Sequence, residues 1–247
     1  ADPKMDDLLD KAGVELDQTK RNALLREAQF RAMEIFTFWG TAHNTAQTAF
    51  QPEARGMRLG AATNGLEDID RAKLLMIVGA NPTEGHPVTG ARIKHPVRRG
   101  TTLIVIDPRN IELSKYAAVH LQLKPGTNVA VLNGLAHVIL AAGLYDEAFI
   151  GRRTENFEAY RQTMAAYTPD HVSDISGVAG DLLRRAARLY ATSGASMCCH
   201  GLGVSEHKYG SFGVMAMANL ALLTGNVGRP GTGINPLRGQ NNVQGAC

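Results

Sequence analysis

Cysteine is scarce in this sequence, and no two cysteines have the spacing of a metal site. Only three of the 247 residues are cysteine, at positions 198, 199 and 247. Without a CxxC pair, the chain alone cannot build a cysteine-ligated zinc site or iron–sulfur cluster. Cys198 and Cys199 stand in an apolar run, which predicts small core residues rather than a redox pair. Residues 1–17 are acidic and lack the apolar core of a signal peptide, so we predict a cytoplasmic location.

Strong net charge and long hydrophobic runs are also lacking. The formal net charge is +3, with 20% charged and 44% hydrophobic residues. This balance predicts no nucleic-acid partner. No apolar run approaches the ~20 residues that a membrane-spanning helix needs, so we predict no membrane span.

Several familiar catalytic signatures are missing as well. The sequence has no complete GxGxxG motif, no Walker A motif, no Ser/His/Asp order and no metal-spaced His pair. His86, His120 and His137 fall within predicted helices or a strand, where we expect structural roles. We therefore assign no metal ligand within the chain, and we expect its chemistry to come from a cofactor or from residues outside it.

The feature that organises the chain is an uninterrupted apolar run followed by a polar turn. Residues 74–87 read LLMIVGANPTEGHP, and similar strand ends follow at residues 102–109 (TLIVIDPR) and 195–203 (ASMCCHGLG). Such runs are typical of strands buried on both faces of a parallel sheet. Because open α/β sheets bind ligands where their strands end, these three turns predict a nucleotide-like ligand laid across one edge.

Strands alternate with helices from residue 63 onward, which predicts an α/β fold with a Rossmann-like, doubly wound, mostly parallel sheet. We predict strands at 74–78, 102–106, 119–123 and 195–200, and helices at 86–99, 111–116, 129–142, 146–150, 155–167, 179–191 and 213–223. Residues 168–169 are expected to begin a plain connection. The more charged segment 1–60 is predicted to be helical at 6–11 and 20–33, with Asp17 as an N-cap, so we place a domain boundary near residue 60 and assign 61–247 to the α/β domain.

The strand-end residues each have a functional and an ordinary interpretation. Gly79 and Asn81 would let a ligand approach the backbone, or they form a common strand-to-helix turn. Asp107 would hold a ribose hydroxyl or a guanine edge while Arg109 pairs with phosphate, or the two form a surface ion pair. Gly201 belongs to a lone GxG, which is weak on its own.

The string from Arg238 to Asn242, RGQNN, is the most unusual one in the chain. Its many hydrogen-bond donors and little bulk suit closing over a polyanion or a small carboxylate, and its composition equally suits a loop tip. A polar loop of this kind needs backbone partners further along a chain. We therefore expect the sequence to be a fragment of a longer polypeptide.

Three long strings, at 64–88, 100–140 and 224–247, closely resemble the catalytic α subunit of molybdenum- or tungsten-dependent formate dehydrogenases, within the molybdopterin oxidoreductase family. The likeness runs from about residue 63 to residue 247. It implies a domain that binds molybdopterin guanine dinucleotide, two copies of which surround the molybdenum or tungsten ion (bis-MGD), for oxidation of formate to carbon dioxide. It also implies electron-transfer partners that carry iron–sulfur clusters, with an iron–sulfur segment outside this chain.

The resemblance carries roles to particular positions. Arg238 matches the active-site arginine that would orient formate. The positions that match cofactor-binding turns are Gly79, Asn81, Glu84, Asp107, Arg109, Gly126, Asn128, Gly201, Leu202, Glu206, Gly239 and Gln240. The family more often has Gln where this chain has Glu206, whose carboxylate would repel a pyrophosphate.

The sequence departs from the formate dehydrogenase pattern upstream of residue 63. There the family carries a cysteine or selenocysteine metal ligand followed by histidine, whereas residues 48–60 read TAFQPEARGMRLG. Residues 1–60 resemble instead the C-terminal lobe of periplasmic peptide-binding proteins, which would make the chain a chimera or an assembly artefact joined near Gly60. We expect the fragment alone to be inactive. Two alternatives stay open, which are another molybdopterin oxidoreductase such as a nitrate reductase and a non-catalytic binding module.

Overall fold

The computed structural model describes residues 66–237, together with Asp7, Lys11, Asp17, Lys20, Ala23 and Leu24. Most of the predicted helices 6–11 and 20–33 therefore lie outside the described residues, as do Arg238, Gly239 and Gln240. In the N-terminal unit, residues 1–44, the backbone N–H of Lys20 donates to Asp17 Oδ1 over 3.0 Å. This is the bond that an N-cap makes to the third helical residue, and it agrees with the predicted cap.

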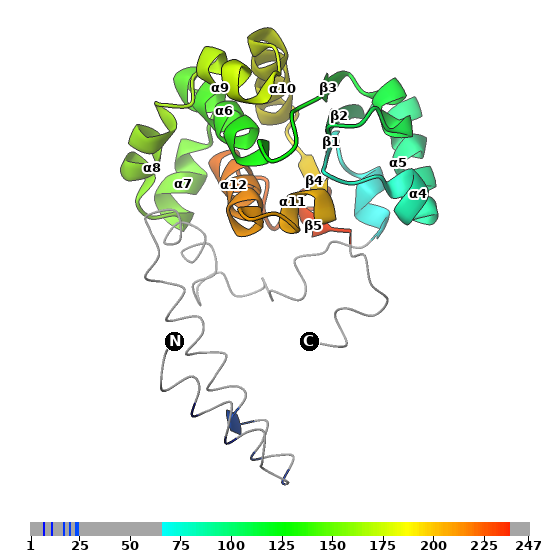
Figure 1. Cartoon of the computed structure of the whole chain (residues 1–247), viewed down its shortest axis with the longest axis horizontal. Coiled ribbons are helices and arrows are strands. Elements are labelled where there is room, and N and C mark those ends of the chain that lie inside the picture. Colours follow the sequence, from blue (N-terminus) through cyan, green and yellow to red (C-terminus); the bar gives the residue numbers. More distant parts are fainter. Residues whose placement is uncertain are drawn as a thin grey trace. The chain divides into compact units, whose positions relative to one another are not determined.

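The second unit, residues 45–247, holds an alternation of strands and helices (Figure 1). Its elements in chain order are η1 (Leu66–Asp70), β1 (Leu74–Val78), α4 (Pro82–Gly85), α5 (Pro87–Arg98), β2 (Thr102–Ile106), η2 (Glu112–Tyr116), β3 (Val119–Leu121), α6 (Asn128–Ala141), α7 (Glu147–Arg153), α8 (Phe157–Met164), α9 (Pro169–Ser176), α10 (Gly180–Thr192), β4 (Ser196–His200), α11 (Leu202–Ser205), α12 (Gly210–Leu223) and β5 (Gly233–Pro236).

Within residues 66–237 the sheet has five parallel strands in the order β3-β2-β1-β4-β5. In its register Leu74 of β1 lies between Thr102 of β2 and Ser196 of β4. The chain adds strands on one side of β1 up to β3 and then crosses to the other side for β4. This reversal between β1 and β4 is the switch point at which open α/β sheets bind ligands. The predicted α/β class with a mostly parallel sheet is confirmed.

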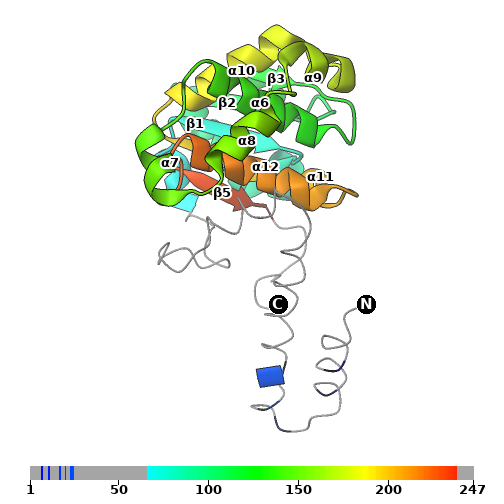
Figure 2. The ribbon, with the colours of Figure 1, turned by 90° about the vertical axis from the view of Figure 1, so that its left-hand side faces the viewer.

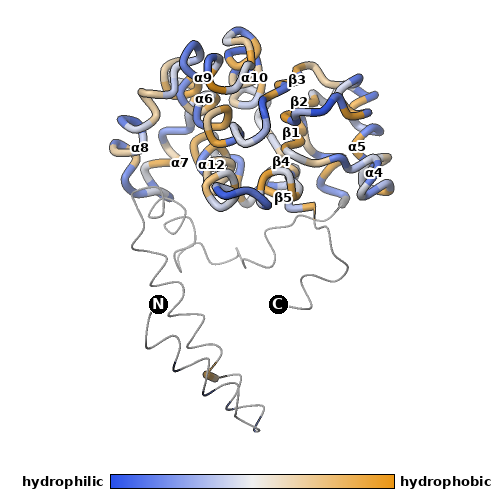
Figure 3. Tube along the Cα trace, in the orientation of Figure 1, coloured by the Kyte–Doolittle hydropathy of each residue, from blue (hydrophilic) through white to orange (hydrophobic). Residues whose placement is uncertain are grey.

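Helices cover both faces of the sheet, which explains why its strands are apolar throughout. In Figure 2, α6 and α12 lie in front of the strands, and in Figure 1, α5 lies on the opposite side. Alternate residues of β1 enter two different cores. Leu74, Met76 and Val78 pack into the larger core with α6, α9, α10 and α12. Leu75 and Ile77 enter a smaller core with α5 and the two 3₁₀ turns. All five β1 residues are buried, as expected for a strand covered on both sides. Figure 3 shows the hydrophobic residues gathered on the strands and on the helix sides that face them.

The helix boundaries follow local capping chemistry. Pro87 occupies the first turn of α5, where its missing N–H costs nothing. Asp146 caps α7 by accepting the N–H of Phe149 at 2.9 Å. Thr168 caps α9 in the same way, through the N–H of His171. The expectation of a plain connection at residues 168–169 was therefore wrong, because Thr-Pro there is a cap followed by a first-turn proline.

The sequence also failed to predict β5 and the single-turn helices α4 and α11. β5, with the sequence GINP, is the last strand of the described sheet and pairs with β4. Glycine and proline disfavour a strand, and its pairing comes from the tertiary fold. Among the helices of the described residues, none combines the length and the apolar composition that a membrane span requires.

Candidate functional site

A pocket of about 420 Å³ opens at the carboxyl-terminal edge of the sheet. Residues that follow all five strands line it: Gly79 after β1, Asp107 after β2, Leu123 after β3, Gly201 after β4 and Leu237 after β5. The pocket therefore lies across the switch point between β1 and β4, where the topology predicts a ligand.

The floor of the pocket is formed by two glycine turns in close contact. Gly79 has φ of +53°, a left-handed conformation that glycine adopts readily. A Cβ on Gly79 would lie 2.7 Å from the carbonyl carbon of Gly203, and a Cβ on Gly203 would lie 2.7 Å from the carbonyl oxygen of Gly79. The Gly203 N–H donates to Gly79 O over 3.0 Å, and Gly201 N–H donates to Val78 O over 3.2 Å. These glycines thus join β1 to β4 and leave bare backbone facing the pocket.

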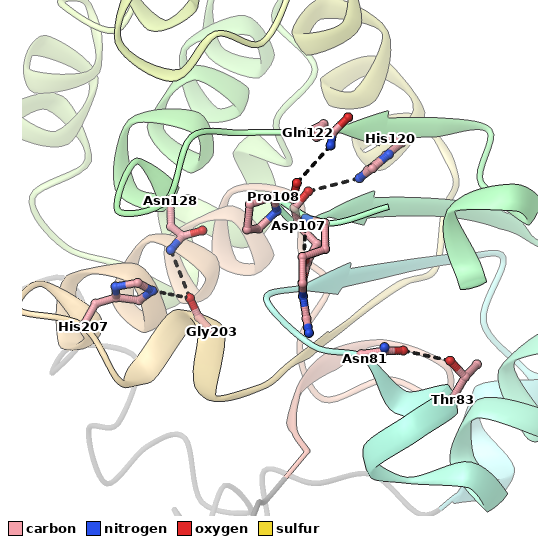
Figure 4. A network of polar contacts seen from close by, with 10 residues as sticks. Asn81, Thr83, Asp107, Pro108, His120, Gln122, Asn128, Gly203 and His207 are labelled. Atoms are coloured by element: carbon pink, nitrogen blue, oxygen red, sulfur yellow. Dashed lines mark hydrogen bonds and ion pairs between the residues drawn. The ribbon is translucent and has the colours of Figure 1, made fainter. Parts of the chain in front are cut away.

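Asp107 forms the wall beyond β2, and its side chain is only 3% exposed. Its Oδ1 accepts the backbone N–H of Arg109 at 2.8 Å and lies 3.4 Å from Arg109 Nε. The Arg109 side chain is 64% exposed, so this ion pair is screened by solvent. His120 Nε2 donates to the Asp107 carbonyl oxygen over 3.1 Å, and Gln122 donates to the Pro108 carbonyl oxygen over 2.9 Å (Figure 4). Bonds from β3 and the residue after it therefore fix the turn that presents the carboxylate.

The opposite wall is held by bonds to one carbonyl. Asn128, the first residue of α6, donates its side-chain N–H to Gly203 O over 3.2 Å. His207 Nε2 donates to the same oxygen over 2.7 Å (Figure 4). In the single turn of α11, Leu202 O accepts the backbone N–H of Glu206, whereas Gly203 O is paired with the side chains of Asn128 and His207. The start of α6 and the turn after β4 are thereby joined through Gly203.

Eight of the predicted site residues line this pocket. They are Gly79, Asn81, Asp107, Arg109, Gly126, Asn128, Gly201 and Leu202. Glu84 and Glu206 are exposed and do not contribute to the lining. Arg238, Gly239 and Gln240 fall outside the described residues, directly after Leu237 of the lining. Cofactor contacts at all these positions stay predictions.

Sequence reasoning missed other lining residues, namely Ala80, Gly85, His86, Pro108, Leu123, Pro125, Gly203, His207 and Leu237. Gly203 had a signal, because it is the second glycine of a GxG after a strand. His86 and His207 had none, since histidines in turns are common and their direction depends on the tertiary fold. His120 and His137 bond backbone carbonyls, His137 through Nδ1 to Met164 O at 3.0 Å, which agrees with the structural roles expected for them.

The two cysteines of the described part are buried in β4, away from the pocket lining. Burial raises the pKa of the Cys199 thiol to about 12 and the pKa of Cys198 well above its ordinary value, so both are neutral thiols. This confirms them as small core residues. Within residues 66–237 and the few described N-terminal positions, no three His, Cys, Asp or Glu side chains gather as a metal site would require.

A parallel sheet of this order with a pocket at its switch point defines the class of Rossmann-like ligand-binding α/β domains. The sequence profile of the molybdopterin oxidoreductase family matches residues 24–247, and the chain belongs to that family. Membership implies a molybdopterin cofactor with molybdenum or tungsten.

Among the proteins with sequences similar to this chain are formate dehydrogenases. Formate dehydrogenase H from Escherichia coli is 45% identical over 188 residues, which are 76% of this chain and 26% of that protein. The F420-dependent formate dehydrogenase 1 subunit alpha from Methanococcus maripaludis is 46% identical over 188 residues, covering 76% of this chain and 28% of the relative. The chain thus spans about a quarter of the length of these curated relatives.

Among solved structures, acetylene hydratase from Pelobacter acetylenicus superposes with a TM-score of 0.59. The two sequences are 24% identical, and the match covers 68% of this chain and 24% of that one. At this identity the likeness shows the fold alone, and it supports the α/β architecture.

Proposed function

We propose that this chain is the cofactor-binding α/β part of a formate dehydrogenase catalytic subunit and holds the guanine dinucleotide form of molybdopterin in the strand-end pocket. The observation that carries the proposal is the buried Asp107 carboxylate in the wall of that pocket. Both of its contacts among the described residues go to Oδ1. Oδ2 is left to accept hydrogen bonds from a guanine edge or a ribose hydroxyl.

The residues around the pocket fit a nucleotide in other ways. Gly79 and Gly203 line the pocket, and because they lack side chains their two turns pack against each other at the switch point, where a diphosphate would lie. The exposed guanidinium of Arg109 suits a phosphate oxygen. Asn128 begins the 14-residue helix α6, and the partial positive charge at its N-terminus favours an anion in the pocket.

When bound, the pterin would supply a molybdenum or tungsten ion that takes up the two electrons released as formate becomes carbon dioxide. The chain's own share would be to hold the dinucleotide and to position formate. Arg238 follows Leu237 of the lining by one residue, and we propose that its guanidinium orients the formate carboxylate through charge-assisted hydrogen bonds. Electrons would then pass to iron–sulfur clusters outside this chain.

The cofactor assignment is tested by purifying the chain natively from a host that makes molybdopterin cofactors. The protein is denatured, and the released material is analysed by mass spectrometry for a pterin and for guanine nucleotide. We expect both from the wild type and neither from Asp107→Ala, with Asp181→Ala as the control because Asp181 on α10 is exposed. A pterin without guanine nucleotide would contradict the dinucleotide form, and no released cofactor at all would contradict the assignment.

The substrate assignment needs a complete catalytic subunit. Because 188 residues align with formate dehydrogenase H at 45% identity, that segment of the enzyme is replaced by the segment of this chain. We expect the hybrid to oxidise formate, and Arg238→Ala to remove most of that activity. Arg185→Ala, an exposed arginine on α10, is the matched control. Equal turnover and KM for formate in the Arg238→Ala hybrid would contradict the role of Arg238.

A further inference from the structure

His207 lines the pocket, and neither the sequence motifs nor the family resemblance gives it a role. It lies in the turn between α11 and α12, two residues after the end of α11. Figure 4 shows its ring beside the Gly203 carbonyl, at the wall formed by α6 and α11. The ring is therefore a candidate for contacting a bound ligand, at a place where the floor of the pocket consists of backbone.

The ring is held in place through one nitrogen. Nε2 donates to Gly203 O over 2.7 Å, and Asn128 donates to the same oxygen. Gly203 in turn donates its N–H to Gly79 O. The position of His207 is thus tied to the contact between the β1 and β4 turns, where the topology places the ligand.

The anchored ring leaves Nδ1 for a ligand. Among residues 66–237 no second hydrogen bond of His207 is present. Because Nε2 carries a hydrogen, Nδ1 of a neutral ring is an acceptor only. A diphosphate also offers acceptors only, so the two interact favourably when the ring is doubly protonated.

The other charges around the pocket leave room for such a cation. Asp107 and Arg109, after β2, compensate each other as an ion pair. α6 contributes the uncharged Asn128, and β5 is followed by the apolar Leu237. The remaining titratable group of the described lining is His86, between α4 and α5; on the turn of His207 itself, Glu206 and Lys208 carry opposite charges.

We propose that His207 contacts the diphosphate of a guanine nucleotide through Nδ1 in its doubly protonated form, so that binding takes up a proton. The inference rests on the proposed function, because it requires a guanine nucleotide in this pocket. It assigns a phosphate-binding residue and a pH dependence to the site. Affinity falls as the pH rises through the range in which histidines titrate.

The test is calorimetric titration of the 247-residue chain with GDP, at about pH 5.5 and about pH 8.5, in buffers of different ionisation enthalpy. The buffer dependence of the binding heat reports proton uptake. The variants are His207→Gln, whose amide can still donate to Gly203 O, His86→Gln, and His171→Gln on the far helix α9 as the matched control. Free GDP titrates identically in every experiment, so differences between variants arise in the protein and in its complex with GDP.

We expect the wild type to lose about tenfold more affinity between the two pH values than His207→Gln, and only His207→Gln to lose the protein's share of proton uptake. His171→Gln and His86→Gln are expected to keep the wild-type pH dependence. Equal proton uptake in the wild type and His207→Gln would overturn the inference, as would its loss in His86→Gln alone.

Two further outcomes are distinguished by design. A wild-type chain that does not bind GDP would overturn the proposed function itself. If His207→Gln fails to fold, ring-nitrogen NMR of the wild type gives the answer, because saturating GDP is expected to shift the titration of His207 to higher pH. An unshifted titration would overturn the inference while leaving the pocket assignment standing.

Discussion

The two edges of the sheet present hollows of opposite character. The carboxyl-terminal edge holds the pocket of about 420 Å³ between glycine turns. The amino-terminal edge has a larger hollow of about 650 Å³, whose lining includes Arg152, Arg153 and Arg229. Volume and positive charge alone would therefore favour the amino-terminal hollow as the binding site for an anion.

The hydrogen bonds separate the two hollows. At the amino-terminal edge Arg229 donates to Gly225 O, Gly194 O and Asn226 Oδ1, and Asn226 Oδ1 also accepts the N–H of Ser196. That guanidinium ties the turns before β4 and β5 together. At the carboxyl-terminal edge, Asp107 and the glycine turns line the pocket, and Asp107 Oδ2 has no partner among residues 66–237. A binding edge is therefore marked by polar groups left for a ligand, whereas a structural edge uses its charges to bond its own backbone.

The largest effect is expected from closing the contact between the glycine turns. Gly79→Ala places a Cβ 2.7 Å from Gly203 and strains a φ of +53°. Overpacking and the left-handed backbone together lower the free energy of unfolding by about 2–5 kcal/mol. Urea unfolding measures the loss. Gly151→Ala is the control, because its Cβ meets nothing within 4 Å, and we expect a neutral or slightly stabilising effect there. Equal stability of both variants would contradict the close contact.

The second effect concerns the Arg229 guanidinium at the amino-terminal edge, which is called the clamp below. Removing it is expected to lower stability without changing binding. Arg229→Ala leaves the Gly225 and Gly194 carbonyls without this donor. We expect a loss of about 1–3 kcal/mol in unfolding free energy, with GDP affinity unchanged. Chemical denaturation and calorimetry measure the two quantities on the same samples. A weakened affinity for GDP in this variant would mean that the amino-terminal edge also serves the ligand.

Strand β4 runs from one edge of the sheet to the other. We expect its buried middle, which includes Cys199, to affect stability but not ligand binding. Burial raises the pKa of Cys199 from its ordinary value of 9.0 to about 12. Above about pH 9 the unfolded thiol ionises while the folded thiol stays protonated, so stability falls as pH rises. The free energy of unfolding then falls by roughly 1 kcal/mol per pH unit because of this thiol, up to about pH 12. Urea unfolding of Cys199→Ala should show a shallower decline than the wild type, with GDP affinity unchanged. Identical slopes would place the thiol in contact with water.

Much of the sheet and of the carboxyl-terminal pocket could be predicted from the sequence. The features that escaped prediction did so for physical reasons. The uninterrupted runs at β1 and β2 predicted buried parallel strands with the observed bounds, because each needs apolar residues on both faces. Parallel strands bring their ends to one edge, so Gly79, Asp107 and Gly201 were expected to converge, and they line one pocket. β5 escaped prediction because its pairing with β4, rather than local preference, makes it a strand.

The lining by His207 and the clamp by Arg229 could not be predicted, since both depend on which backbone carbonyl a long or planar side chain reaches in the folded chain. Glu84 illustrates the converse. It stands in the first cofactor-binding turn by sequence match, yet the short helix α4 leaves it exposed and outside the lining. Position in a motif does not fix the direction of a side chain.

The most direct test of the central assignment is GDP affinity measured by calorimetry in three proteins: the wild type, Asp107→Asn and Arg229→Ala. Asp107→Asn keeps an oxygen for the Arg109 N–H but replaces an acceptor oxygen and removes the charge. We predict that the wild type binds GDP, that Asp107→Asn binds about tenfold more weakly, and that Arg229→Ala binds like the wild type. Equal affinities in the wild type and Asp107→Asn, or loss in Arg229→Ala alone, would contradict the assignment of the carboxyl-terminal edge.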